Sequence, residues 1–310
     1  MITNFGSNNV GVLFNTGSGA FLPATTYPAD TYPCSVSVVD VNGDGKPDMA
    51  VANLGAANVG VLLNAGDGTF LSQTTYPVGA NPTTIVVVDV NNDHLPDIVV
   101  VNQNSNNVGV LLNAGGGTFY SQTTFITGAH PSGLAVVDVN LDNRPDIIVT
   151  NEYWGNVGVL LNTGNGTFLS QMTYTTDGGP VSVAVADLNS DSLPDIVVAN
   201  YASNNISVLL NGGNGTFLSQ TTYAAGNNPN SVSIVDVNND NLPDIVVTNR
   251  SSNNVGVYLN AGNATFLPQI TYSTGSVPSS VRVVDMDHNG KPDIVVINVG
   301  DASVGVFLQY

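Results

Sequence analysis

Acidic and amide side chains recur in six nine-residue segments with one spacing. The first, Asp40–Asp48, reads Asp-Val-Asn-Gly-Asp-Gly-Lys-Pro-Asp and has oxygen-bearing side chains at segment positions 1, 3, 5 and 9. Alternate positions of a tight loop can point inward, and the backbone carbonyl at position 7 can join them. Hard cations such as Ca²⁺ take about six to eight oxygen ligands at about 2.3–2.6 Å. The spacing therefore predicts a calcium-binding loop in which water completes the coordination shell.

Five positions define the candidate ligands of every segment, and position 7 contributes its backbone carbonyl. The predicted sets are Asp40, Asn42, Asp44, Lys46 and Asp48; Asp89, Asn91, Asp93, Leu95 and Asp97; Asp138, Asn140, Asp142, Arg144 and Asp146; Asp187, Asn189, Asp191, Leu193 and Asp195; Asp236, Asn238, Asp240, Leu242 and Asp244; and Asp285, Asp287, Asn289, Lys291 and Asp293. The sequence thus predicts up to six bound Ca²⁺ ions.

The distribution of charge supports the cation prediction. The six segments hold 18 of the 23 acidic residues, and the whole chain carries only five basic residues and a net charge of −18. Carboxylates gathered in nine residues repel one another unless a cation lies between them. Six Ca²⁺ ions would bring the net charge from −18 to −6. The alternative is a set of Asx-type turns with solvated carboxylates. Such turns need only one or two Asp each, and they do not explain the same four-ligand pattern in all six segments.

Two further details refine the loops. The spacing resembles the first half of an EF-hand loop, but the flanks read as strands and no Glu stands at position 12, so an EF-hand is rejected. Position 6 favours residues that tolerate a positive φ. Gly or Asn occupies it in four segments, whereas His94 and Ser192 fit less well, which predicts two weaker sites.

The segments belong to an uninterrupted repeat of 49 residues. A second motif, close to Asn-Val-Gly-Val-Leu-Leu-Asn, recurs with the same step, beginning at Asn9, Asn58, Asn107, Asn156, Asn205, Asn254 and Ser303. One period predicts four strands, at 35–39, 49–53, 59–63 and 69–76, and no long helix. Four short strands per repeat of this length indicate a β-propeller blade. A parallel β-solenoid is the alternative, although its coils are usually shorter.

The predicted fold is therefore all-β, a seven-bladed β-propeller forming one domain over residues 1–310. The predicted blades are 1–33, 34–82, 83–131, 132–180, 181–229, 230–278 and 279–310. The first lacks its first strand and the last lacks its fourth, which predicts 26 strands and three-stranded end blades. Unpaired edges recruit partners. Three interpretations of the end blades stay open. The chain assembles end to end into a homo-oligomer or filament, it is a monomer with three-stranded end blades, or the sequence is cut short at Met1.

The residues also point to a known family. Asp40–Asn53 (DVNGDGKPDMAVAN) and Asn58–Phe70 (NVGVLLNAGDGTF) resemble the FG-GAP/VCBS repeat, which builds integrin α-subunit propeller heads and certain fungal lectins. The resemblance covers nearly the whole chain and implies seven blades with Ca²⁺ between the first two strands of a blade. The Phe-Gly and Gly-Ala-Pro elements that name the family are not matched as such. The family leaves function open, since propellers serve adhesion, sugar binding and catalysis.

Composition excludes several partners. A net charge of −18 repels the phosphates of nucleic acids and anionic membrane surfaces. No apolar run approaches the ~18 residues of a membrane span. Cys34 is the single cysteine, so an intrachain disulfide is impossible.

No signal peptide is visible, and Met1 falls inside a repeat. The repeat family nevertheless favours an extracellular, secreted setting.

No catalytic constellation emerges from the remaining residues. His94, His130 and His288 lie in different repeats, and no Ser/His/Asp or Cys/His set recurs. The segment Glu152-Tyr153-Trp154 contains the sole Glu and the sole Trp. It is either a single ligand site for a sugar or a surface loop whose sequence has diverged from the other repeats. The sequence thus predicts no enzyme activity.

Glycosylation is a further prediction. Five Asn-x-Ser/Thr triplets begin at Asn165, Asn205, Asn214, Asn249 and Asn263, and three of these occupy the same turn before the fourth strand. For the whole chain we expect a non-catalytic, calcium-stabilised extracellular scaffold or adhesion module with protein or glycan ligands. The alternative is a carbohydrate-binding lectin with pockets between blades.

Overall fold

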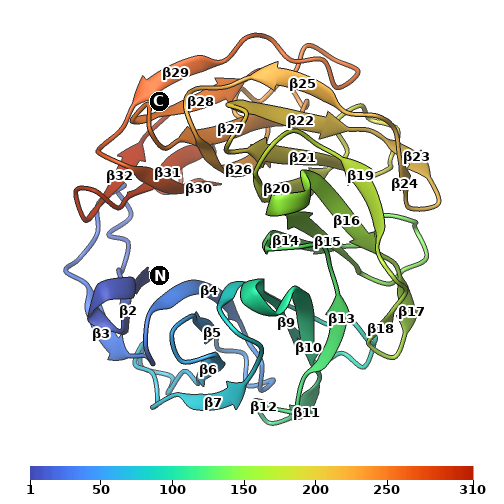
Figure 1. Ribbon diagram of the computed structural model, residues 1–310. Coiled ribbons are helices and arrows are strands. Elements are labelled where there is room, and N and C mark those ends of the chain that lie inside the picture. The colour runs from blue at the N-terminus through green and yellow to red at the C-terminus, as the bar shows by residue number, and fades with distance from the viewer. Residues whose placement is uncertain (310) are drawn as a thin grey trace.

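Seven antiparallel sheets surround a common axis in the computed structural model, which describes residues 1–309 (Figure 1). Five sheets have four strands, and the first and last sheets have three. The three-stranded sheets are β1-β2-β3 and β30-β31-β32, which lie next to each other where the ring meets itself. The predictions of a seven-bladed propeller and of three-stranded end blades are confirmed.

Each blade runs outward from the axis. The innermost strands are β4 (Pro33–Val39), β8 (Pro82–Val88), β14 (Pro131–Val137), β20 (Pro180–Ala186), β26 (Pro229–Val235) and β30 (Pro278–Val284). The second strands are β1 (Ile2–Asn4), β5 (Asp48–Asn53), β9 (Asp97–Asn102), β15 (Asp146–Asn151), β21 (Asp195–Asn200), β27 (Asp244–Asn249) and β31 (Asp293–Asn298). Every innermost strand begins with Pro, which has no N–H to donate and is tolerated at a strand's first residue.

The outer half of each blade is a second hairpin. The third strands are β2 (Asn9–Val12), β6 (Asn58–Leu62), β10 (Asn107–Leu111), β16 (Asn156–Leu160), β22 (Asn205–Leu209), β28 (Asn254–Tyr258) and β32 (Ser303–Phe307). The fourth strands are β3 (Thr25–Pro28), β7 (Thr74–Pro77), β13 (Thr123–Ile126), β19 (Met172–Thr175), β25 (Thr221–Ala224) and β29 (Ile270–Ser273).

Short elements complete the chain. Three two-stranded hairpins are β11 (Asn113–Gly115) with β12 (Thr118–Phe119), β17 (Asn162–Gly164) with β18 (Thr167–Phe168), and β23 (Asn211–Gly213) with β24 (Thr216–Phe217). Three 3₁₀ turns are η1 (Phe5–Ser7), η2 (Gln103–Ser105) and η3 (Glu152–Trp154). No helix within residues 1–309 is long and apolar enough to cross a membrane.

The fourth strand starts later than the sequence predicts. The expected strand at 69–76 divides, because Phe70 first pairs back with Asn64 in an isolated bridge. The paired strand β7 begins only at Thr74. The corresponding segments of three other blades form the two-stranded hairpins, each with a register shift. The Gly-rich turn therefore closes a small hairpin of its own before the chain joins the blade.

The second strands form the centre of the core. All six residues of β5 are buried, and the same is true of β9, β15, β21 and β27. Each lies between two strands of its own sheet and is covered on both faces by neighbouring blades. This position explains why the second strands read as unbroken apolar runs rather than as alternating ones.

Edge-to-face aromatic pairs join each of the first five blades to the blade that follows it. Tyr76 of β7 meets Phe119 of the next blade edge to face, with ring centroids 5.5 Å apart. Four equivalent pairs lie at 5.1–5.4 Å. Such T-shaped contacts contribute about 0.5–1.5 kcal/mol beyond the area that they bury. The repeat therefore specifies the contact between blades as well as each blade.

Candidate calcium-binding loops

The six acidic segments all connect an innermost strand to a second strand. Asp40 follows β4 directly, and Asp48 is the first residue of β5. The five remaining loops join the corresponding strands of their blades. Because the blades repeat around one axis, the six loops lie at one end of the ring. The structure thus places each predicted ligand set in a single short loop.

Two residues of every loop have a left-handed backbone. At position 6, Gly45 has a φ of 81°, and His94 and Ser192 have φ values of 68° and 69°. Position 4 is also left-handed, with φ values from 60° to 78° at Gly43, Asn92, Leu141, Ser190, Asn239 and His288. The structure therefore gives all six loops one conformation. The prediction that the His94 and Ser192 loops bind more weakly remains a prediction.

The position-1 carboxylate organises the loop backbone. Asp40 accepts N–H groups at Oδ1 from Asn42 at 3.2 Å and from Gly43 at 2.8 Å. Its Oδ2 accepts from Gly45 at 2.7 Å. Burial would raise the pKa of Asp40, but these backbone hydrogen bonds outweigh that effect and hold the pKa below its usual range. Asp40 is therefore ionised at neutral pH and available to a cation.

Positions 3 and 5 lie against each other. In the second loop, Asn91 Nδ2 donates to Asp93 Oδ2 at 2.9 Å, and equivalent bonds of 2.8–3.2 Å occur in the third, fourth and fifth loops. In the first and third loops the basic position-7 side chain reaches the position-5 carboxylate: Lys46 Nζ lies 3.7 Å from Asp44 and Arg144 lies 3.9 Å from Asp142. A cation bound in those two loops would neutralise the position-5 carboxylate in place of the basic side chain.

The position-9 carboxylate joins the loop to the outer hairpin. Asp97 accepts the N–H of Val90 at Oδ2 (3.0 Å) and the N–H of Asn113 at Oδ1 (2.8 Å), and its side chain is fully buried. A carboxylate offers about four lone-pair sites, so two remain for an ion. Asp97 therefore has a structural role as well as its predicted ligand role.

Burial changes the protonation of this position. Desolvation raises the pKa of Asp97, Asp146 and Asp195 to about 6, although the backbone hydrogen bonds act in the opposite direction. The other loop carboxylates add a smaller repulsion in the same direction as burial. Desolvation also raises the pKa of Asp48 and Asp244. A divalent cation in the loop would reverse this effect because it favours the ionised form.

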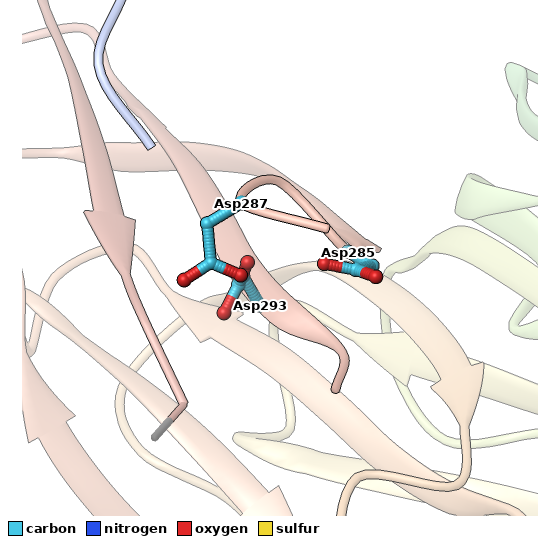
Figure 2. Close-up of side chains that lie close together, drawn as sticks. All are labelled: Asp285, Asp287 and Asp293. Carbon is cyan, nitrogen blue, oxygen red and sulfur yellow. The ribbon is translucent and has the colours of Figure 1, made fainter. Parts of the chain in front are cut away.

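The sixth loop gathers three carboxylates most closely. Asp285, Asp287 and Asp293 each offer one oxygen within 4.8 Å of the others, and they form the only such group of three in the described part of the chain (Figure 2). Here Asp replaces Asn at position 3 and Asn289 replaces Asp at position 5. Figure 2 shows Asp287 and Asp293 side by side, with Asp285 across the loop.

The donor set of these loops fits Ca²⁺. It consists of carboxylate, amide and carbonyl oxygens without sulfur or imidazole, which is the chemistry of a hard cation. No basic side chain other than Lys46 and Arg144 lies within 4.0 Å of a loop carboxylate in residues 1–309. The carboxylates of four loops are thus without a charged partner, and an ion would supply one.

Sequence reasoning missed the residues that anchor the loops from outside. Asn113 Nδ2 donates to the carbonyl of Val41, which is position 2 of the preceding blade's loop, at 2.9 Å. The equivalent bonds run from Asn162 to Val90, from Asn211 to Val139 and from Asn260 to Leu188, all at 2.9 Å. The recurring Asn after Leu-Leu was the available sequence signal, but its partner lies 72 residues away. These residues tie the first four loops to the next blade.

The Glu152-Tyr153-Trp154 segment forms a local cluster on η3. His130 Nδ1 lies 2.7 Å from Glu152 Oε2, and the His130 ring stacks on Tyr153 with centroids 4.2 Å apart. Tyr153 and Trp154 are 70% and 58% exposed. The segment thus presents two aromatic faces to solvent beside a hydrogen-bonded His–Glu pair.

The glycosylation sequons differ in accessibility. Asn165, Asn214 and Asn263 are exposed, and each has a left-handed backbone in its turn. Asn205 is half-buried. Asn249 is fully buried and its amide donates to Asn254 at 2.8 Å, so the fold argues against a glycan there.

Solved structures with this architecture have diverse activities. An Agrocybe aegerita lectin that recognises non-reducing terminal N-acetylglucosamine is 20% identical, with a TM-score of 0.61 over 96% of this chain and 89% of the lectin chain. A candidate 6-phosphogluconolactonase from Bacteroides uniformis is 14% identical, with a TM-score of 0.75 over 97% and 88%. A virginiamycin B lyase from Staphylococcus aureus is 14% identical, with a TM-score of 0.64 over 97% and 86%. At these identities the likeness shows the fold alone.

Family membership rests on the repeats themselves. No curated protein sequence matches the chain significantly. The FG-GAP-like repeat, in contrast, matches residues 1–51, 40–100, 89–149, 138–198, 187–247 and 236–296. These six overlapping matches contain all six acidic loops and span nearly the whole sequence. The chain therefore belongs to the FG-GAP-like repeat family.

Proposed function

We propose that this protein is a non-catalytic, calcium-stabilised extracellular scaffold or adhesion module. The observation that carries the proposal is the sixfold repetition of one loop conformation with one set of oxygen donors. A catalytic site needs a single distinctive arrangement, whereas these loops repeat with the blades. Up to six ions would neutralise the loops and stabilise the ring, leaving the outer faces of the blades to bind protein or glycan ligands.

The side-chain geometry favours a role without catalysis. The one contact between a His and a carboxylate in residues 1–309 is that of His130 with Glu152, and no hydroxyl or thiol is hydrogen-bonded to the His130 ring. Burial raises the pKa of the single thiol, Cys34, to about 12, which keeps it protonated and unreactive. The buried Asp residues with raised pKa values all occupy position 9 of the repeated loops, so they do not mark a single catalytic site.

Thermal unfolding tests the proposal. Ions that bind only the folded state stabilise it by about 2.7 kcal/mol per site at one hundred times Kd. The melting midpoint should therefore rise when Ca²⁺ replaces a chelator at pH 7. An unchanged midpoint would contradict calcium stabilisation, and Mg²⁺ at equal ionic strength controls for charge screening.

A second candidate function is carbohydrate binding, which the exposed cluster on η3 favours. Sugars stack on aromatic faces, and Tyr153 and Trp154 present two of them beside Glu152. The similarity in fold to the Agrocybe aegerita lectin adds support. A glycan array with the protein and with its Trp154→Ala variant separates the two functions. Binding that the variant loses supports a lectin, and no binding to any glycan leaves the scaffold function.

A further inference from the structure

Buried asparagine residues connect neighbouring acidic loops. Asn113, in the short strand β11, donates its backbone N–H to Asp97 Oδ1 at 2.8 Å, and its side-chain Nδ2 donates to the carbonyl of Val41 at 2.9 Å. Asp97 is position 9 of the second loop, whereas Val41 is position 2 of the first. The two loops lie in adjacent blades. One residue therefore holds a predicted ligand of one loop and the backbone of its neighbour.

Inside the first loop, further hydrogen bonds connect Val41 to predicted ligands. Its N–H donates to Asp48 Oδ2 at 3.0 Å. Its carbonyl, which accepts from Asn113, belongs to a planar peptide group whose other end is the N–H of Asn42. That N–H donates to Asp40 Oδ1 at 3.2 Å. A turn of the Val41 carbonyl would therefore move the N–H away from Asp40, so Asn113 fixes the peptide plane that holds the position-1 carboxylate.

The same contacts recur along five of the six loops. Asn162, Asn211 and Asn260 donate their backbone N–H groups at 2.8 Å to the position-9 carboxylates of their own blades. Their side chains donate at 2.9 Å to the position-2 carbonyl of the preceding blade's loop. In each loop so linked, the position-2 N–H donates to the position-9 carboxylate at 2.9–3.0 Å. We call this chain of hydrogen bonds the loop relay; its members are Asp48, Asp97, Asp146, Asp195 and Asp244, Asn113, Asn162, Asn211 and Asn260, and Val41, Val90, Val139 and Leu188.

Every member of the loop relay is buried. Water therefore cannot take the place of a lost partner, and a buried donor or acceptor left without one costs more than an ordinary hydrogen bond contributes. Hydrogen bonds that follow one another in a low-dielectric interior also strengthen each other. For both reasons the members of the relay become ordered together, and an event that fixes one of them restricts the next.

We propose that the asparagines of the loop relay are positioning residues for Ca²⁺, and that loops joined by the relay bind Ca²⁺ cooperatively. The inference rests on the calcium binding proposed above. Asp97, once fixed as a ligand in the second loop, holds Asn113, which holds the Val41 carbonyl of the first loop. The neighbouring loop then loses less conformational freedom when it binds its own ion. The coupling is reciprocal, so each loop raises the affinity of the other by the same factor.

The first and second loops provide the most specific pair for a test. No hydrogen bond joins them directly within residues 1–309, whereas the second and third loops also share a bond from Asn92 Nδ2 to the Asn143 carbonyl at 3.3 Å. His94 predicts weaker binding in the second loop, so the first loop fills before it. The coupling should therefore lower the Ca²⁺ concentration at which the second loop fills.

Hydrogen exchange of the full chain during a Ca²⁺ titration measures this concentration, as the midpoint at which the amides of residues 90–95 gain half of their added protection. Asp44→Asn removes a ligand from the first loop but keeps the oxygen that accepts the Lys46 N–H, and it should raise the midpoint at least about fivefold. In an Asn113→Ala background the same change should have little effect, because the charges remain but the relay is cut. Asp287→Asn in the sixth loop, outside the relay, removes the same charge and should leave the midpoint unchanged.

A rise that Asn113→Ala leaves intact, or no rise in the parent chain, would refute the coupling. A readout without Ca²⁺ separates this inference from the proposed function. In the Asn113→Ala variant the amides of residues 41–46 should exchange at least about fivefold faster, whereas those of residues 237–242 in the fifth loop should not change. Unchanged exchange in the first loop would refute the positioning role even in a chain that binds Ca²⁺. Absence of any Ca²⁺-dependent protection would instead overturn the proposed calcium binding, and the cooperativity with it.

Discussion

The side-chain amide of Asn15 donates a hydrogen bond of 2.6 Å to the backbone carbonyl of Met286, which is 271 residues away. Asn15 belongs to the first blade, and Met286 is position 2 of the last acidic loop. The bond is the same one that Asn113 forms with Val41 between adjacent blades. The ring thus closes through the repeated contact between blades, without an exchange of strands between the two ends.

This relationship predicts unequal effects of one substitution at equivalent positions. Asn113→Ala leaves the buried carbonyl of Val41 without a partner and should cost about 1–3 kcal/mol. Asn64→Ala should cost less, because Asn64 Nδ2 reaches only Pro47 of its own blade. Melting midpoints of the two variants provide the measurement. Equal losses would show that the bond between blades contributes nothing.

The left-handed backbone of the loops predicts a stabilising substitution. Leu141 has a φ of 61° and is 56% exposed, so it is strained without burying its side chain. Leu141→Gly should remove about 1–2 kcal/mol of backbone strain. The greater conformational entropy of glycine in the unfolded chain opposes part of this gain in stability. Gly43→Leu, at the equivalent position, should destabilise the protein. Chemical denaturation measures both, and a destabilised Leu141→Gly variant would contradict the assigned conformation.

Two aspartates of one loop should respond differently to substitution. Asp93→Asn keeps the oxygen that accepts the Leu95 N–H and loses only the exposed bond from Asn91 Nδ2, so it should mainly reduce the stabilisation that Ca²⁺ provides. Asp97→Asn removes one of two oxygens that accept buried N–H groups, and should destabilise the protein even with a chelator present. Melting with and without Ca²⁺ distinguishes them. The same behaviour from both would refute the dual role of position 9.

The buried aspartates predict a pH dependence with a definite sign. Asp97, Asp146 and Asp195 have folded pKa values of about 6, above the ordinary value of about 3.9. Between these values the folded chain binds more protons than the unfolded chain. Without Ca²⁺, stability should therefore fall as the pH rises from about 4 to about 6.

Calcium should reverse that trend. Because the ligands must be ionised, Ca²⁺ affinity should increase as the pH rises through about 6. Midpoints measured between pH 4 and pH 7, with Ca²⁺ and with a chelator effective across that range, test both statements. Curves that run parallel would contradict a link between these carboxyl groups and the ion.

The sequence sufficed for features that depend on local spacing. The loops and the seven blades follow from a 49-residue period and from oxygen donors at alternate positions. The late start of β7 could not be predicted in this way, because Phe70 pairs with Asn64 before the chain joins the blade as a fourth strand. The pKa of Asp97 depends on burial between blades, and the anchoring by Asn113 depends on a partner in another repeat. Both require the folded ring.

The calcium content of the folded protein tests the central claim most directly. Isothermal titration of metal-free protein with Ca²⁺ at pH 7 gives the number of ions bound per chain, and a titration with Mg²⁺ controls for selectivity. Six loops of one conformation predict up to six bound Ca²⁺ ions per chain, with the weakest sites in the His94 and Ser192 loops, and weaker binding of Mg²⁺ throughout. A folded protein that binds no Ca²⁺ would contradict the account.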